Sequence, residues 1–144
     1  MRALQAGGRI WLCAEAVIDY FPRDSLRQLS RQYLRHGRGR ARTTAKHRLR
    51  LRLRQCLPIV ILAALIAALL FPVIPLLALP AAAYVVVCLL WGATDATRSR
   101  DPALLLMGPA AIVMHVAWAI GFLEGRLKHA LRPTGAGRAV LEAV

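Results

Sequence analysis

The sequence predicts a mainly α-helical membrane protein with a basic segment on its N-terminal side. Its charge is strongly segregated: residues 23–54 hold twelve Lys or Arg residues and one acid, whereas no charged side chain occurs over 55–94 or 102–123. A basic segment directly before a long apolar region is typical of the cytoplasmic membrane face, where it attracts anionic head groups and orients the following span. Each basic residue near such a surface contributes about 1 kcal/mol, so this segment alone predicts membrane-surface binding.

These changes in composition divide the chain into four regions. Residues 1–21 form short mixed segments, 22–55 the basic segment, 56–127 the apolar region, and 128–144 a Gly-containing tail that we expect to be flexible. The net charge is +13, and residues 1–55 supply +11 of it through fourteen basic residues and three acids. Because the basic block adjoins membrane-length apolar segments, we expect the lipid bilayer and anionic lipid, and not nucleic acid, as its partners.

Residues 1–21 have the composition of the end of a larger sheet domain. Gly7-Gly8 indicates a turn, and the segments 9–13 and 16–21 are rich in β-branched and aromatic residues. This pattern is typical of two short strands. Two strands alone are marginal in water, so we expect them to pair with a sheet that lies outside this sequence.

A basic amphipathic helix is predicted after Pro22. Ser25 and Gln28 have the spacing of a capping box, and Gly37 is of the type found just beyond a helix end. Such a helix is suited to lie in the membrane interface, although a solvated basic face packed on a soluble domain is the alternative. The arginines recur every three or four residues and share one stripe, which comprises Arg27, Arg31, Arg35 and Arg38.

Residues 48–54 alternate arginine and leucine. A period of two is typical of a strand, but arginine side chains can also snorkel from a helix that enters the membrane, so both interpretations stay open. Under either interpretation we expect the arginines of this segment to lie at the membrane interface; they are Arg48, Arg50, Arg52 and Arg54.

The apolar run 57–93 is too long for one membrane crossing. Its 37 residues would form a helix of about 55 Å, whereas the hydrocarbon core is about 30 Å thick. Pro72 and Pro75 lie near its centre and predict a helical hairpin, with spans over 57–73 and 76–93 and the turn at the prolines. A third span is expected over 103–123.

The basic block predicts that the first span starts in the cytoplasm. Three crossings then place the later basic residues outside, against the positive-inside tendency; these residues are Arg126, Lys128, Arg132 and Arg138. Either the first block dominates the orientation, or the third segment, which Gly108-Pro109 interrupts, re-enters without crossing. We expect three crossings.

No catalytic constellation is visible in the sequence. It contains no phosphate-binding loop, no nucleophile elbow, no zinc-protease motif and no Asp-x-Asp pair. The three cysteines are scattered without metal-ligand spacing, and we expect them to be reduced and packed as small apolar residues. His115 lies inside the third apolar segment, where an ionisable residue is a functional candidate, although a neutral imidazole can equally hydrogen-bond to a neighbouring helix.

Four segments resemble a known enzyme family. The order Ala6–Leu12, Tyr20–Leu26 and Arg31–Ala41 resembles the C-terminal portion of family 2 glycosyltransferases, closest to membrane-bound bacterial enzymes of the succinoglycan (exopolysaccharide) biosynthesis type. His115–Gly125 is similar to the last transmembrane segment of that group. The resemblance covers about residues 5–127 and rests on four motifs in the right order.

The resemblance implies a GT-A nucleotide-sugar-binding domain followed by a basic interfacial segment and C-terminal membrane helices, in the bacterial inner membrane with the basic part on the cytoplasmic side. The family transfers a sugar from a nucleotide donor to an acceptor that is often linked to polyprenyl diphosphate. Its divalent metal, Mg or Mn, and its general base depend on Asp motifs that this chain lacks. We therefore expect no cofactor in this chain, and an acceptor-side, membrane-anchoring role that needs the GT-A domain in cis or in trans.

Related enzymes carry a Gln-x-x-Arg-Trp sequence on an interfacial helix beside the acceptor channel and the donor diphosphate. Gln32 and Arg35 have this spacing, but His36 stands where Trp is expected. The resemblance thus implies that Gln32 and Arg35, with the neighbouring Arg31 and Arg38, face a diphosphate, while a generic basic stripe remains the alternative. The rival to the whole enzymatic hypothesis is a small standalone membrane protein whose basic segment recruits a partner or anionic lipid.

Overall fold

The computed structural model describes residues 6–131, apart from 10, 12, 14, 20, 52 and 71. Within these residues the protein is mainly helical, with four α-helices joined by short 3₁₀ segments and turns. The described residues before Leu26 form turns and extended chain without a helix or a strand. The two strands predicted over 9–13 and 16–21 are therefore not confirmed, and three of their positions lie outside the described residues. The tail 132–144 also lies outside them.

Helix α2 spans Leu26–Lys46 and begins as the sequence predicts. Ser25 has extended backbone dihedrals, and its hydroxyl oxygen accepts a hydrogen bond from the Gln28 backbone N–H at 3.3 Å. This bond satisfies one of the donors that a helix start leaves unpaired. The predicted end at Gly37 is wrong, because α2 continues for two and a half further turns and ends where Arg48 adopts a positive φ of 49°.

The predicted turn at the proline pair is confirmed. Helix α3 spans Leu53–Ala67 and continues as a 3₁₀ turn, η1, over Ala68–Leu70. After a turn, the 3₁₀ segment η2 covers Pro75–Ala78 and leads into α4, which spans Leu79–Ser99. Pro75 and Pro80 both sit in the first turn of their elements, where a missing backbone N–H costs no hydrogen bond.

Helix α5 spans Met107–Ala130 and follows the 3₁₀ segment η3 over Pro102–Leu106. The sequence predicted an interruption at Gly108-Pro109, but both residues lie in the first turn of α5, so the helix is continuous behind them. Gly108 is needed for close packing, because a Cβ at this position would lie 2.7 Å from the carbonyl oxygen of Cys88 on α4. Helices α4 and α5 therefore form a tight hairpin near η3.

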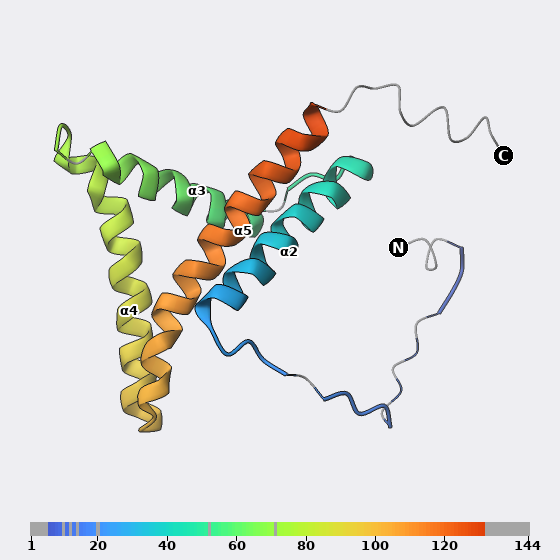
Figure 1. Cartoon of the computed structure of the whole chain (residues 1–144), viewed down its shortest axis with the longest axis horizontal. Coiled ribbons are helices and arrows are strands. Elements are labelled where there is room, and N and C mark those ends of the chain that lie inside the picture. The colour runs from blue at the N-terminus through green and yellow to red at the C-terminus, as the bar shows by residue number, and fades with distance from the viewer. Residues whose placement is uncertain are drawn as a thin grey trace.

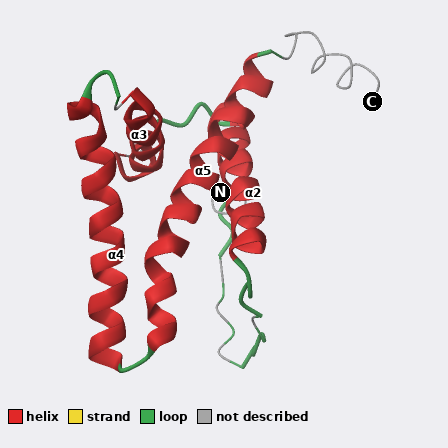
Figure 2. Ribbon diagram, turned by 60° about the vertical axis from the view of Figure 1, so that its left-hand side comes forward, coloured by secondary structure: helices red, strands yellow, loops and turns green. Residues whose placement is uncertain are grey.

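Helix α5 is central to the arrangement, because it contacts each of the other three helices (Figure 1). Helices α4 and α5 diverge from the η3 end, and α3 runs across the opening between them, as both ribbon views show (Figures 1 and 2). Helix α2 lies along the C-terminal half of α5 and makes the most extensive helix–helix contact of the described chain. The loop from α2 to α3 is short, so α3 begins close to the α2–α5 pair.

The contact between α2 and α5 depends on small residues. Gly37 and Ala41 on α2 face Gly121 and Gly125 on α5, and a Cβ added to Gly37 would overlap the carbonyl oxygen of Trp118. A four-residue spacing of small side chains on both helices allows this close approach of the two backbones. Gly37 is thus a packing residue and not a helix-end residue, which is why the sequence-based prediction of the helix end failed.

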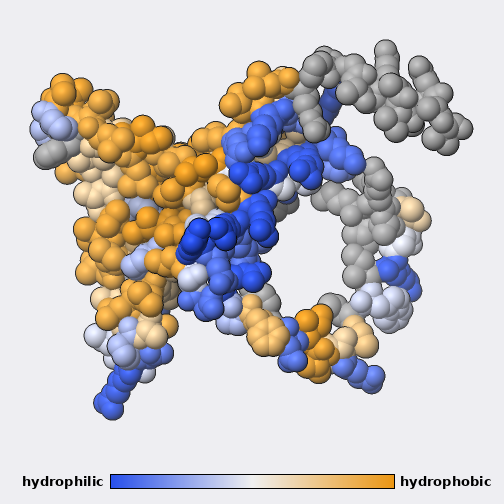
Figure 3. Space-filling model, in the orientation of Figure 1, coloured by the Kyte–Doolittle hydropathy of each residue, from blue (hydrophilic) through white to orange (hydrophobic). Residues whose placement is uncertain are grey.

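Two of the helices are long and apolar enough to cross a membrane, Pro75–Ser99 and Pro102–Ala130, counted with their 3₁₀ starts. Their most apolar windows have a mean hydropathy of 2.2 and 2.0, and only 11% and 17% of these windows is buried. The apolar surface therefore faces outward over α3 and α4, whereas the basic surface gathers over α2 (Figure 3). Three spans are not confirmed, since the first apolar helix, Gln55–Leu70, is shorter than a span.

Candidate functional site

The first half of α2 forms one wall of a polar cavity of about 370 Å³, here called the α2 polar cavity. Residues spaced three and four apart share one face of a helix, so the side chains of the predicted Gln-x-x-Arg motif come together with others of that face. The cavity is lined by Arg23, Gln28, Arg31, Gln32, Arg35 and His36. Three of the four predicted diphosphate-facing residues thus share one cavity.

Gln32 is held in place by a residue that sequence reasoning missed. The Nε of Arg23 donates a hydrogen bond of 3.0 Å to the side-chain oxygen of Gln32, nine residues further along. This bond folds the chain before α2 back over the helix and adds a third guanidinium to the cavity beside Arg31 and Arg35. Guanidinium groups offer paired N–H donors that match phosphate oxygens. The cavity therefore has the charge and the donors that a diphosphate requires.

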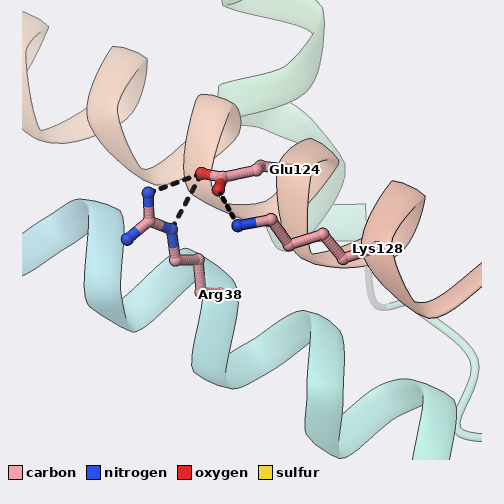
Figure 4. A network of polar contacts seen from close by, with 3 residues as sticks. All are labelled: Arg38, Glu124 and Lys128. Atoms are coloured by element: carbon pink, nitrogen blue, oxygen red, sulfur yellow. Dashed lines mark hydrogen bonds and ion pairs between the residues drawn. The ribbon is translucent and has the colours of Figure 1, made fainter. Parts of the chain in front are cut away.

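Arg38 lies apart from the α2 polar cavity. Its Nε and Nη2 contact Oε2 of Glu124 on α5 at 2.8 and 2.6 Å, and Lys128 contacts Oε1 of the same carboxylate at 2.6 Å (Figure 4). One acid thus joins two cations from two helices. These residues border a second cavity of about 800 Å³, here called the basic cleft, which is lined by Arg38, Arg42, Gly125, Lys128 and His129.

An apolar groove adjoins the α2 polar cavity. It has a volume of about 420 Å³ and lies between the first half of α2 and the middle of α5. Arg31 lines both the groove and the α2 polar cavity, so a polar space and an apolar space meet at this side chain. The remaining lining residues are Ser30, Leu34, Ile112, Val113, Val116, Ala117 and Ile120.

A fourth space, here called the three-helix cavity, lies among α2, α3 and α5 and has a volume of about 460 Å³. It contains the predicted intramembrane histidine, His115, whose Nδ1 lies 2.8 Å from the hydroxyl of Tyr84 on α4. His36 lines this cavity as well as the α2 polar cavity. Its other lining residues, none of them predicted, are Tyr33, Arg40, Gln55, Pro58, Met114 and Trp118.

The predicted interface arginines follow α2. Arg48 takes the left-handed conformation at the end of that helix, and Arg50 lies exposed in the loop to α3. Arg52 and the side chain of Arg54 lie outside the described residues. Leu53 starts α3, so the described part of 48–54 is a loop followed by the start of a helix, and it forms neither a strand nor a helix over the whole segment.

No metal centre is formed by the part of the chain that the structure describes. Within it, no three His, Cys, Asp or Glu side chains come close enough to hold an ion. Cys13 and Cys88 form no disulfide, and Cys13 is exposed. The chemistry of the described region is therefore that of guanidinium, amide and imidazole groups, which bind and orient anions or hydroxyls.

A basic helix packed along an apolar helix of membrane-spanning length is typical of a membrane-associated protein. Comparison with known proteins makes this more specific. The chain is 39% identical over 118 residues, 82% of its length, to the succinoglycan biosynthesis protein ExoA of Rhizobium meliloti (strain 1021). This similarity confirms the resemblance to family 2 glycosyltransferases of the succinoglycan biosynthesis type.

The chain spans 36% of the length of that relative. No protein-family model matches the sequence. No solved structure matches it either. The apolar helices and the glycosyltransferase relative together point to membrane association.

Proposed function

We propose that this chain is the membrane-anchoring, acceptor-side part of a glycosyltransferase of exopolysaccharide biosynthesis, which transfers sugar from a nucleotide donor to a lipid-linked acceptor. The observation that carries the proposal is the meeting of the α2 polar cavity and the apolar groove at Arg31. The similarity to the succinoglycan biosynthesis protein supports the reaction class. The donor sugar and its divalent cation would be bound by a GT-A catalytic domain, supplied in cis or in trans.

The two adjoining spaces suit the two halves of a lipid diphosphate. Arg23, Arg31 and Arg35 provide guanidinium donors for the phosphates, and Gln32 is fixed among them by its bond to Arg23. The groove on α5 is lined almost entirely by aliphatic side chains, which suits the hydrocarbon chain. A ligand with a charged head and an apolar tail would thus be oriented with its head group above the start of α2.

We further propose that the chain crosses the membrane twice, through α4 and α5, and that α3 does not cross. The contacts of α2 with α5 place Arg38 beside Glu124 and Ala41 beside Gly125, so the C-terminal end of α5 lies with the basic helix. Only an even number of crossings between these two segments is compatible with that contact. Two membrane-length helices and the shorter α3 satisfy this condition.

This arrangement places the C-terminal ends of α2 and α5 on the cytoplasmic side and the η3 end of the hairpin outside. The basic residues at the end of α5, Arg126 and Lys128, then lie on the same side as the basic block, as the positive-inside tendency requires. Helix α3 would lie near that surface, with its exposed Leu57, Val60 and Ile66 in the apolar part of the bilayer.

Single cysteines in a cysteine-free background test the crossings through labelling by a membrane-impermeant maleimide in intact cells and in lysed cells. With two crossings, Lys46→Cys and His129→Cys react only after lysis, while Ser99→Cys reacts in intact cells. With three crossings the pattern inverts for the last two positions, because Ser99 returns to the cytoplasm and His129 emerges outside. That inverted pattern would overturn the two-crossing proposal.

The enzymatic proposal is tested in a chimera in which the matched 118 residues of the Rhizobium relative are replaced by those of this chain. Transfer of radiolabelled sugar from a nucleotide donor to the lipid fraction is the readout. We expect the chimera to be active and the purified 144-residue chain to be inactive alone. Arg35→Gln should lower the activity of the chimera at least tenfold, because it removes charge-assisted phosphate contacts of about 1.5–3 kcal/mol, whereas Arg98→Gln in the last turn of α4 should not.

Transfer by the isolated chain, or equal activity of the Arg35→Gln and Arg98→Gln chimeras, would contradict the proposed role. An expressed, membrane-inserted chimera that has no activity would favour the standalone membrane protein.

A further inference from the structure

The three-helix cavity is a built binding site that the diphosphate role does not use. Polar side chains from three helices converge on it: Arg40 from α2, Gln55 from α3 and His115 from α5. Its apolar and aromatic lining includes Pro58, Met114 and Trp118. A largely apolar cavity of about 460 Å³ with a few convergent polar groups has the size and composition of a site for a small organic ligand.

Two polar groups of this cavity, Arg40 and His115, each have one ring or guanidinium nitrogen for which no hydrogen bond is found among the described residues. The Nη2 of Arg40 donates to the side-chain oxygen of Gln55 at 3.1 Å, but its buried Nε has no hydrogen-bond partner among the described residues. A buried donor without a partner costs about 1–3 kcal/mol, so a ligand oxygen at this point would remove a penalty. Tyr84 occupies Nδ1 of His115, which leaves Nε2 as the ring atom that can serve a ligand.

The cavity also has two aromatic side chains whose orientations are fixed by stacking. Tyr33 stacks on His36 with ring centroids 5.6 Å apart, and Trp118 stacks on Phe122 with centroids 5.1 Å apart. Aromatic surface combined with hydrogen-bond donors and acceptors suits a sugar ring, which has apolar C–H faces and a rim of hydroxyl groups. A hydrocarbon chain would leave the buried Nε of Arg40 without a partner.

The three-helix cavity lies next to the α2 polar cavity, where the diphosphate is proposed to bind. His36 lines both the three-helix cavity and the α2 polar cavity, so the two spaces adjoin at that side chain. A sugar attached to a diphosphate in the α2 polar cavity could therefore enter the three-helix cavity. Trp118 supplies a large aromatic ring to the same region from α5.

We propose that the three-helix cavity binds the sugar ring next to the diphosphate of the lipid-linked acceptor, with Trp118 as an aromatic wall and Arg40 as a hydrogen-bond donor to the sugar. The proposal rests on the proposed function, since it assumes that a lipid diphosphate occupies the α2 polar cavity. It assigns acceptor selection to α2 and α5 together.

The test compares two probes on the full chain in phosphatidylcholine nanodiscs: a short-chain prenyl diphosphate, and the same molecule with one hexose on its terminal phosphate. Trp118→Leu should weaken the glycosylated probe about three- to tenfold and leave the sugar-free probe unchanged. Arg40→Gln should act in the same selective way. Trp91→Leu is the matched control, because Trp91 lies on α4, is 64% exposed and bonds to Asp95 outside the cavity.

The sugar-free probe separates the failures of the two proposals. If it binds and Trp118→Leu weakens both probes alike, or weakens neither, the sugar site is wrong and the diphosphate role stands. If neither probe binds the unaltered chain, the proposed function itself is overturned. Unchanged binding of the sugar-free probe also shows that each variant is folded, so a selective loss cannot be attributed to unfolding.

Discussion

The close contact between α2 and α5 makes a quantitative prediction for two glycines of α2. A Cβ on Gly37 would lie 2.7 Å from the backbone nitrogen of Phe122 and would overlap the Trp118 carbonyl oxygen, whereas a Cβ on Gly39 meets nothing within 4 Å. Alanine favours a helix over glycine by about 1 kcal/mol at either position. Overpacking costs about 1–3 kcal/mol, and only Gly37→Ala incurs this cost. The free energy that holds α2 on α5 should therefore differ between the two alanine variants by about 1–3 kcal/mol.

Amide hydrogen exchange of α2, measured by mass spectrometry in neutral nanodiscs, reports this difference, because an exposed helix opens more readily than a packed one. The α2 amides of Gly37→Ala should exchange roughly 5- to 150-fold faster than those of Gly39→Ala, given that 1.4 kcal/mol is a factor of ten. Gly39→Ala should exchange no faster than the unaltered protein. Equal exchange in the two variants would refute the argument that Gly37 sits at a backbone crossing.

Two further predictions concern charge and capping. Changing both Arg42 and Lys128, which line the basic cleft, to Gln should weaken binding to vesicles that contain anionic lipid by about 2 kcal/mol at low salt, at about 1 kcal/mol per residue, and the loss should shrink as salt is raised. The Arg98→Gln/Arg100→Gln variant loses the same charge and should bind these vesicles as the unaltered protein does. An equal loss in both variants would exclude the basic cleft as the lipid-binding surface. Ser25→Ala should weaken the first turn of α2 by about 0.5–2 kcal/mol, visible as faster amide exchange confined to that turn, and unchanged exchange there would contradict the capping role.

Local signals in the sequence predicted much of the helical framework. The cap at Ser25 and the turn at Pro72 and Pro75 depend on residues close together in the chain, so the sequence alone predicts them. The amphipathic character of α2 likewise follows from its periodicity. The end of α2 could not be found this way, because glycine serves equally as a helix-end residue and as a contact residue. Only the presence of α5 against Gly37 distinguishes these roles.

The candidate site was predictable to the extent that it lies on one helix. Gln32, Arg35 and Arg31 share a face of α2 and one cavity, whereas Arg38 is diverted to Glu124, 86 residues away in the sequence. Periodicity places residues on a face but does not say what that face meets. The sequence did not single out Arg40, because it is one of many basic residues and its role depends on a cavity that α3 and α5 complete.

The disagreement between three crossings and the positive-inside tendency was itself informative. The sequence expectation counted every apolar segment as a span, which left the basic residues after α5 on the outer side. Pairing of α2 with α5 removes that conflict under the proposed two-crossing arrangement, because the ion pair of Arg38 with Glu124 requires both helices to be on one side. Because an exposed ion pair contributes little to stability, the packing of Gly37 on Gly121 must supply most of the energy that holds the two helices together. Gly121→Leu, which forces the two helices apart, should therefore change the labelling of His129→Cys far more than Glu124→Gln does. Equal labelling in the two variants would show that packing does not fix the end of α5.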